Sequence, residues 1–386
     1  MRGSAGNSGE GPATPSPESF TLPGVSSFDA IADLPLLIES CEFEGLSLDA
    51  GAFERLTTIV KLRGGGHEGI GEDVVYDAVD HIGQQDHGPP EGLTGSFTFA
   101  ELSDLLDGID LFPAGEPVRE DVSRDYRRWA FESAALDLAL RQAGTNLAEA
   151  LGREPQPLNF VSSMRLAGWE EGARSSIEPL RERLAVYPTL RFKLDPANDW
   201  DDKLIEALAE TGAVDSLDLK GFYKGTPVDV ETDPELYAKL IETFPDAWLE
   251  DPDVTAETKP LLDPVSDRVT WDAPIHSVAD IEAMPWSPPK VVNVKPSRFG
   301  PVRNLFAAYD YCEERGIGAY GGGQTELGQG RGQIQYLASL FHPDTPNDVA
   351  PGGYNDPRQA TRPGLPSSPL EPDIEAIGFR WKLPSR

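Results

Sequence analysis

The feature that most constrains the fold of this chain is a repeated order of short apolar strand, loop and amphipathic helix between about residues 155 and 350. One unit reads LRFKLDP at residues 190–196 and continues into residues 198–213, where Asp201 or Asp202 can cap a helix that Gly212 ends. Seven such strands can be counted, and an eighth is indicated at NDVAP, residues 347–351. Strand–helix units of roughly 20 to 30 residues predict parallel strands closed into a ring. We therefore predict an α/β fold, a TIM barrel of the (β/α)7β type.

The part of the chain before this region has a different pattern. Residues 54–72, ERLTTIVKLRGGGHEGIGE, are typical of two antiparallel strands joined by a glycine-rich turn, and residues 125–144 are typical of a helix. Because 386 residues exceed one ordinary core, we expect two domains. The predicted parts are a disordered Gly/Ser/Pro-rich tail at 1–24, an α+β domain at 25–153, the barrel at 154–350 and a C-terminal segment at 351–386 that packs back on the α+β domain.

The charge of the chain excludes some classes of partner. It has 65 acidic and 33 basic residues and a formal net charge of −32, whereas nucleic acids and anionic membranes attract basic patches. No apolar run reaches membrane-spanning length, and the start of the chain lacks a signal-peptide core. We therefore expect a cytoplasmic protein whose partner is a small molecule rather than a nucleic acid or a membrane.

The strands predicted for the barrel end in ionisable residues. In such a barrel the carboxyl ends of the strands line the mouth of the active site. Three consecutive strands end in acids and the strands on either side end in lysines, in the order Lys193, Asp218, Glu250, Asp272 and Lys295. With LNFVSS at 158–163 as the first strand, the two lysines lie on strands two and six, which face each other across an eight-stranded ring.

Three carboxylates that converge repel one another unless a cation cancels their charge. An oxygen-only site without histidine or cysteine suits Mg²⁺, with Mn²⁺ as the alternative. Two lysines on opposite sides of this ion could remove and return a proton on the carbon next to a carboxylate, while the metal stabilises the enediolate. A lysine must be neutral to act as a base, so we expect Arg191, on the same side of the strand as Lys193, to lower the Lys193 pKa together with the metal.

Each of these residues also has a simpler interpretation. A strand-end acid in an acidic protein is more often a solvated loop residue or a helix cap, and Lys193 alone could be an ordinary ion-pair partner. The order lysine, acid, acid, acid, lysine on successive strands favours the joint functional interpretation.

The same residues and their neighbours resemble the enolase superfamily, and most closely its muconate-lactonizing subgroup of o-succinylbenzoate synthases, N-acylamino acid racemases and dipeptide epimerases. The resemblance covers about residues 30–375. The motifs that carry it are RFKLD at 191–195, LDLKG at 217–221, WLEDP at 248–252, TWDAP at 270–274, VVNVKPSRFG at 291–300, YGGGQTELGQGRGQ at 320–333 and PNDVAPGGYND at 346–356.

The resemblance implies roles for these positions. It makes the α+β domain a cap over the barrel, places Glu326 beside the substrate and matches Asp348 to a motif of the last strand. It assigns the acid/base pair to Lys193 and Lys295, and the metal to Asp218, Glu250 and Asp272.

Three positions depart from the pattern of the family. Arg191 replaces a lysine, Lys220 replaces the usual Asn, and Ala273 follows the third metal-ligand position where a Glu is common. Lys220 could bind a second anionic group of the substrate or pair with the local excess of carboxylates, and both interpretations stay open.

The resulting hypothesis is an Mg²⁺-dependent enzyme, assembled as a homo-oligomer, that abstracts the proton α to a carboxylate as a racemase, epimerase or cycloisomerase. One alternative is a dehydratase of an acid sugar on the same scaffold. A second is a Schiff-base aldolase with Lys193 or Lys295 as nucleophile, although the three acids would then have no purpose. A third is a non-catalytic member that binds only metal or ligand.

Overall fold

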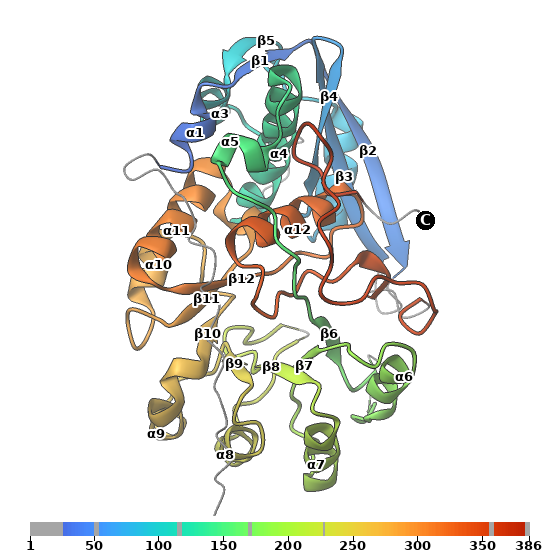
Figure 1. Cartoon of the computed structure of the whole chain (residues 1–386), viewed down its shortest axis with the longest axis vertical. Coiled ribbons are helices and arrows are strands. Elements are labelled where there is room, and N and C mark those ends of the chain that lie inside the picture. The colour runs from blue at the N-terminus through green and yellow to red at the C-terminus, as the bar shows by residue number, and fades with distance from the viewer. Residues whose placement is uncertain are drawn as a thin grey trace, which may run out of the picture.

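The computed structural model describes residues 26–49, 54–113, 118–168, 172–226, 228–354 and 359–382, so the predicted tail at 1–24 lies outside the described residues. Its central feature is a parallel sheet of seven strands that follow one another in chain order (Figure 1). The strands are β6 (Ser162–Arg165), β7 (Phe192–Asp195), β8 (Val214–Asp218), β9 (Trp248–Glu250), β10 (Val269–Trp271), β11 (Val291–Val294) and β12 (Gly318–Gly321).

A short eighth segment joins the two edges of this sheet. Asn347 pairs in parallel with Phe160, just before β6, and Asp348 pairs in parallel with Gly322, just after β12. The side chain of Asn347 strengthens the closure, because its Oδ1 accepts the Gly321 N–H at 2.6 Å and its Nδ2 donates to the Asn159 carbonyl at 3.0 Å. The predicted capped barrel of the (β/α)7β type is therefore confirmed, with the last strand reduced to single bridges.

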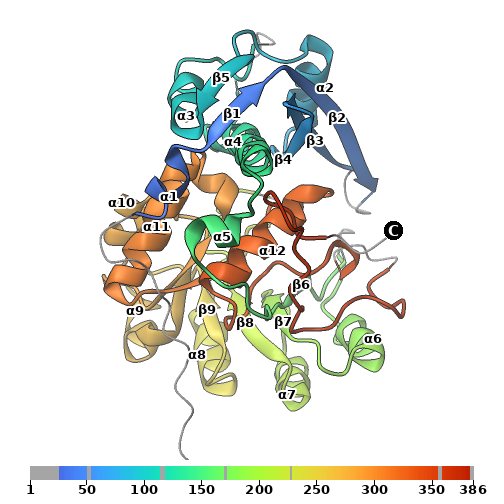
Figure 2. The ribbon, with the colours of Figure 1, turned by 45° about the horizontal axis from the view of Figure 1, so that its top comes forward.

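Helices connect the strands and lie outside the ring, as in Figures 1 and 2. They are α6 (Glu178–Val186), α7 (Asp202–Thr211), α8 (Pro234–Thr243), α9 (Lys259–Leu262), α10 (Val278–Ala283), α11 (Val302–Arg315) and α12 (Gln329–Phe341), with short 3-10 turns η1 (Asp263–Arg268), η2 (Pro296–Phe299) and η3 (Gly352–Tyr354). Local sequence sets their ends: Asp201 accepts the Leu204 N–H at 2.9 Å at the start of α7, and Gly212 ends the helix in the left-handed conformation.

The residues before the barrel form a second domain, which we call the cap (Figure 2). Its main sheet is the antiparallel set β2 (Ser40–Asp49), β3 (Glu54–Gly64) and β4 (His67–Asp73), and β1 (Pro35–Ile38) pairs with β5 (Gly95–Thr98). The helices are α1 (Asp29–Ala32), α2 (Ala78–His87), α3 (Phe99–Leu106), α4 (Val122–Ala143) and α5 (Leu147–Leu151). The glycine-rich turn predicted from residues 54–72 joins β3 to β4.

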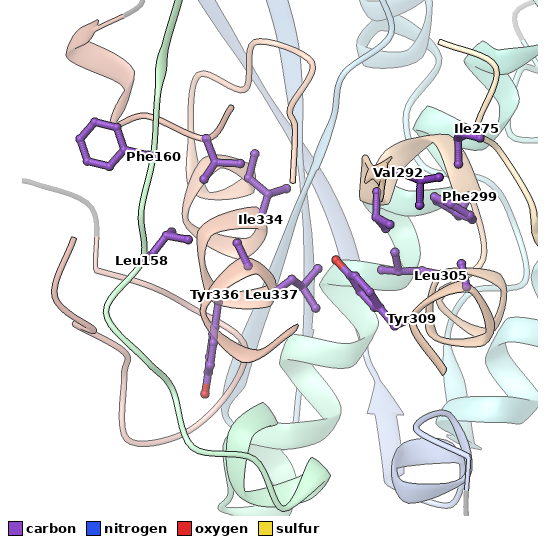
Figure 3. Close-up of a cluster of buried hydrophobic side chains, with 14 of the residues drawn as sticks. Leu158, Phe160, Ile275, Val292, Phe299, Leu305, Tyr309, Ile334, Tyr336 and Leu337 are labelled. Atoms are coloured by element: carbon purple, nitrogen blue, oxygen red, sulfur yellow. The ribbon is translucent and has the colours of Figure 1, made fainter. Parts of the chain in front are cut away.

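The cap and the barrel share one hydrophobic core. Helix α4 is buried on nearly every side, since it packs against β4 and against η2 of the barrel. Gly69 and Gly71 allow this close approach, because a Cβ on either would lie within 2.1 Å of an α4 carbonyl oxygen. Figure 3 shows part of the same core, with Leu305 of α11 and Leu337 of α12 among its side chains. Burial of each such side chain stabilises the fold by about 1.5–3 kcal/mol, so the cap is fixed on the barrel.

The C-terminal segment runs back over the junction of the two domains. Leu370 pairs with Leu158, and Gly378 pairs with Asn146 at the start of α5. Asp137 of α4 accepts the N–H of Phe379 at 2.8 Å and is paired with Arg380 at 2.7 Å. This segment therefore ties α4 of the cap to the chain that enters the barrel. Among the described residues, no helix has the length and apolar character needed to cross a membrane.

His342, directly after α12, contacts Asn347 of the segment that closes the barrel. Because Asn347 donates with its Nδ2, its Oδ1 accepts from Nδ1–H of the neutral imidazole at 2.7 Å. The other ring nitrogen lies 3.3 Å from the Tyr309 hydroxyl. Burial lowers the pKa of His342 to about 4 from its ordinary value of 6.5.

We predict that His342 lowers the stability of the protein as the pH falls from 6.5 towards 4. The unfolded chain binds the proton first, so up to roughly 3 kcal/mol of unfolding free energy is present above pH 6.5 and is lost as the pH falls through the folded-state pKa. The variant His342→Asn keeps an N–H donor for Asn347 and removes the titration. Urea unfolding of both proteins at several pH values measures this. On acidification the unfolding free energy of the wild type should fall relative to that of His342→Asn, and parallel curves would contradict the prediction.

Candidate active site

The charged strand-end residues lie together at the carboxyl end of the barrel. Lys193 is part of β7, Asp218 and Glu250 are the last residues of β8 and β9, and Asp272 and Lys295 directly follow β10 and β11. All five side chains are buried, and the most exposed of them, that of Lys295, is only 9% accessible. The structure therefore brings the five residues into one enclosed cluster of opposite charges.

Lys193 is surrounded by carboxylates. Its Nζ pairs with Oε1 of Glu250 and lies 3.2 Å from Oδ2 of Asp218 and 3.5 Å from Oδ2 of Asp348. The second oxygen of Glu250 accepts a hydrogen bond from the Tyr320 hydroxyl at 2.7 Å. Because both oxygens of Glu250 are bound, this carboxylate is held in a fixed orientation.

Lys220 adds a second cation at the same oxygen of Asp218. Its Nζ lies 2.5 Å from Oδ2 of Asp218 and 3.4 Å from Oδ1 of Asp195. Burial by itself would raise the pKa of Asp218, but Lys220 and Lys193 outweigh it and lower that pKa to about 2. The ion-pair interpretation of Lys220 therefore describes the contacts of this structure, and binding of a second substrate anion remains a prediction.

Asp272 has a separate pair of cationic partners. Its Oδ2 accepts from Nζ of Lys295 at 2.9 Å and its Oδ1 accepts from Nη1 of Arg298 at 2.7 Å. Burial opposes ionisation, but Arg298 and Lys295 outweigh it and hold the pKa of Asp272 well below its usual range. Arg298 was not predicted from the sequence. The signal that could have found it is its position in KPSRFG, three residues after Lys295, where η2 turns it back towards the strand end.

Asp251 is a further buried acid that the sequence analysis missed. It follows Glu250 in a left-handed conformation, with φ of +48°, and its two oxygens accept the N–H groups of Asp272 and Ala273 at 2.8 Å each. Burial and the neighbouring Asp272 raise the pKa of Asp251 to about 7. Its carboxylate therefore fixes the end of β10 beside the end of β9.

The donor set fits a hard divalent cation. Among the described residues, Asp218, Glu250 and Asp251 can each offer an oxygen so that the three atoms lie within 4.8 Å of one another. Carboxylate oxygens are ligands that suit Mg²⁺ and Mn²⁺. This group shares two members with the predicted trio. The third predicted member, Asp272, is joined to the group through Asp251 and carries its own cations.

The two lysines approach the acids from different strands. Lys193 lies on the second strand of the ring and Lys295 follows the sixth, with the acid-bearing strands β8, β9 and β10 between them. Lys193 contacts Glu250 and Asp218, whereas Lys295 contacts Asp272. Burial would lower the pKa of Lys193, but Glu250, Asp218 and Asp348 outweigh it and raise that pKa well above its ordinary value.

Arg191 does not take part in this cluster, so its predicted effect on Lys193 is wrong. It precedes β7 at the amino-terminal end of the barrel, where Nε donates to Asp215 at 2.9 Å and a second nitrogen donates to the Gly212 carbonyl. Side chains at positions i and i+2 of a strand share a face but are about 6–7 Å apart along it. In a barrel this separation divides the closed amino-terminal end from the active-site mouth.

Glu326 and Asp348, the two remaining predicted residues, lie in the loop after β12 and in the short eighth segment of the ring. Glu326, in the loop between β12 and α12, is buried and pairs with Nη2 of Arg331 at 3.0 Å, and Asp348 reaches Lys193 as described above. Gly322, at the start of that loop, leaves room for Lys295, because a Cβ there would lie 2.5 Å from Cε of the lysine.

The fold and this cluster together define a class of protein. The dipeptide epimerase from Enterococcus faecalis is similar in structure, with a TM-score of 0.63 and 17% identity over 89% of this chain and 99% of that one. The chain thus has the capped-barrel fold of the enolase superfamily, and the predicted resemblance is confirmed. The chain belongs to the family described as domain of unknown function DUF8230, whose N-terminal domain matches residues 29–150 and whose C-terminal domain matches residues 154–356.

Two curated relatives are enzymes of the same superfamily. The o-succinylbenzoate synthase of Bacillus subtilis is 27% identical over 230 residues, which are 57% of this chain and 57% of the relative. The N-succinylamino acid racemase of Amycolatopsis sp is 29% identical over 234 residues, or 58% of each chain. The matched region is therefore less than two thirds of the length of each relative.

The position of Arg191 generates a prediction about turnover. The variant Arg191→Gln should retain the wild-type kcat within about twofold, because its guanidinium is bound to Asp215 at the far end of the barrel from the lysines. Measured turnover in a folded variant checks this. A large loss of kcat with unchanged stability would instead support an electrostatic role for Arg191 at Lys193.

The carboxylate cluster generates a prediction about metal binding. Mg²⁺ at one hundred times its Kd should stabilise the wild-type protein by about 2.7 kcal/mol, and the resulting rise in Tm should be lost in Asp218→Asn. Asp246→Asn is the matched control, because Asp246 is an exposed acid in the groove at the other end of the barrel. Thermal unfolding with and without Mg²⁺ measures the effect. An equal loss in both variants would assign the stabilisation to general charge screening.

Proposed function

We propose that this protein removes a proton from the carbon next to a carboxylate of a small-molecule substrate, in a reaction that depends on a divalent cation. The observation that carries the proposal is the placement of Lys193 and Lys295 on the second and sixth strands, each in contact with a different acid of one buried cluster. Two opposed lysines favour racemisation, epimerisation or cycloisomerisation, because one can take a proton from one face of the substrate while the other can donate a proton to the opposite face.

The proposed ion is Mg²⁺, with Asp218, Glu250 and Asp272 as its ligands. Both oxygens of Asp251 are bound to fixed backbone N–H groups, whereas the partners of Asp272 are side-chain cations that an ion could replace, so we assign Asp251 to holding Asp272 in place rather than to the ion. When bound, the ion would stabilise the charge that develops on the substrate carboxylate and would neutralise the acids that now raise the Lys193 pKa.

The remaining steps belong to the side chains of the chain itself. In its neutral form either lysine can accept the α-proton, and in its ammonium form the other can return it, so each must change its charge during a turnover. The enclosed position of both amines excludes bulk water from the proton that is moved. Lys220 and Glu326 are proposed to contact the substrate from either side of this pair.

The names of the relatives support this class of reaction and suggest the first substrates to test. They act, by name, on N-succinylamino acids or form o-succinylbenzoate, and the similar structure is that of a dipeptide epimerase. We therefore propose N-acylamino acids, dipeptides and succinyl-substituted acids as the first candidates.

Exchange of the substrate α-proton with D₂O tests the proposal directly. Wild-type protein with Mg²⁺ should exchange the α-proton of at least one candidate acid, as detected by proton NMR. Lys193→Ala and Lys295→Ala should each reduce turnover by about a hundredfold or more, measured on folded protein with Mg²⁺ present.

Lys239→Ala is the matched control, because Lys239 is an exposed lysine that pairs with Asp202 on the outside of the barrel. Its turnover should equal that of the wild type. Normal turnover in either active-site variant would remove that lysine from the mechanism. Absence of exchange by the wild-type protein across all candidate acids would favour a member that binds metal or ligand only.

A further inference from the structure

The loop that carries Glu326 is held by the cap rather than by the barrel. Arg55 of β3, which is fully buried, donates to the carbonyl oxygens of Gln324 at 2.9 Å and Thr325 at 3.4 Å. Thr325 has a φ of +56°, an unfavourable conformation for a residue other than glycine. A contact from the other domain therefore maintains the shape of this loop.

Glu72 of β4 binds the other end of the same loop. Its side chain is 0% exposed, and its Oε1 accepts the N–H of Leu327 at 2.7 Å. Its Oε2 accepts the N–H of Gly330 at 2.9 Å, and the N–H of Gly328 lies 3.1 Å and 3.0 Å from the two oxygens. One carboxylate thus accepts from three N–H groups at and just before the start of α12, where the helix dipole also favours negative charge.

Gly330 leaves room for this contact, because a Cβ there would lie 2.8 Å from Oε2 of Glu72 and 3.1 Å from Cγ of Glu326. A Cβ on Gly328 would lie 2.9 Å from side-chain atoms of Leu46 and Ile59 of the cap. Gly330 therefore admits a protein carboxylate at the start of α12.

Glu326 is placed between the two contacts from the cap. Its Oε1 accepts the N–H of Gln324 at 2.7 Å, and its Oε2 pairs with Arg331 in the first turn of α12. The loop begins at Gly322, beside Lys295. Movement of this segment would therefore displace Glu326 and loosen the packing against the lysine.

We propose that Glu72 is a positioning residue of the active site: through its two carboxyl oxygens, it fixes residues 327–330 and so sets Glu326 and the surroundings of Lys295. The expected effect on catalysis rests on the proposed function, whereas the expected effect on the loop rests on the contacts alone. Glu72→Gln conserves the size of the side chain but replaces one acceptor oxygen with an NH₂ group, which would face a backbone N–H. An unpaired buried donor is the expected result.

The cap provides a matched control in Glu132 of α4. This residue is also 0% exposed, and its Oε2 accepts the N–H of Val302 at the start of barrel helix α11 at 2.7 Å. Its Oε1 accepts from Ser103 and Arg128. Glu132→Gln therefore removes the same kind of buried charge from the same interface without a contact to the loop of Glu326.

Amide hydrogen exchange, followed by mass spectrometry, and steady-state kinetics test the proposal together. In Glu72→Gln the amides of 327–330 should exchange at least about tenfold faster than in the wild type, because their acceptor is impaired. For the acid that the wild type turns over, kcat should fall by about tenfold to a hundredfold with KM nearly unchanged, as small misplacements of catalytic groups do. Glu132→Gln should leave both the exchange of 327–330 and kcat near the wild-type values.

A second variant covers the case in which Glu72→Gln does not fold. Gly330→Ala leaves the charge of Glu72 intact and pushes it off the loop, so it should reproduce the same loss of kcat and of amide protection. Unchanged protection of 327–330 in folded Glu72→Gln or Gly330→Ala would overturn the proposal, as would an equal loss in Glu132→Gln. Absence of turnover in the wild type would refute the proposed function alone, because the amide exchange needs no substrate.

Discussion

The structure depends on the neutralisation of buried carboxylates at one end of the barrel. Four acids, Asp218, Glu250, Asp251 and Asp272, end three adjacent strands with almost no exposure to solvent. Such charges are costly to bury unless each is paired. Here the charge is met by Lys193 and Lys220 on one side and by Lys295 and Arg298 on the other, so that the acids are compensated from both flanks.

This arrangement explains why the lysines are both structural and chemical groups. An amine that pairs with buried acids is held as an ammonium ion, as the raised Lys193 pKa shows. The same amine can act as a base once its acids have another cation to neutralise them. The cluster is therefore suited to exchange one set of cations for another, which is the property that the proposed reaction requires.

The cap contributes to the site through the loop that carries Glu326. Helix α4 and strand β4 join the core of the barrel, and the contacts of Arg55 and Glu72 bring the cap to the loop of Glu326. The two domains thus share one site, with the acids and amines supplied by the barrel and the position of the last loop supplied by the cap. A chain with the barrel alone would lack the acceptor for the N–H groups of Leu327, Gly328 and Gly330.

Much of this arrangement could be predicted from the sequence, because the period of the strands and the residues that end them are local features. Parallel strands closed into a ring necessarily bring the ends of β7 to β11 together, so the five charged residues could be placed before the fold was known. The prediction for Arg191 was wrong because alternation along a strand gives only the face on which a side chain lies. Its position along the barrel axis depends on where the strand starts. Asp251 was missed because only its left-handed turn directs it under the end of β10. Arg298 and Glu72 act across elements, and their partners are not visible in a local pattern.

A crystal structure of the protein with Mn²⁺, in which the ion is located by its anomalous scattering, tests the central claim most directly. The account predicts one strong peak bound by Asp218, Glu250 and Asp272, with the Nζ atoms of Lys193 and Lys295 on opposite sides of it and Lys193 no longer paired with Glu250. A peak confined to surface acids, or two amines on the same side of the ion, would contradict the account.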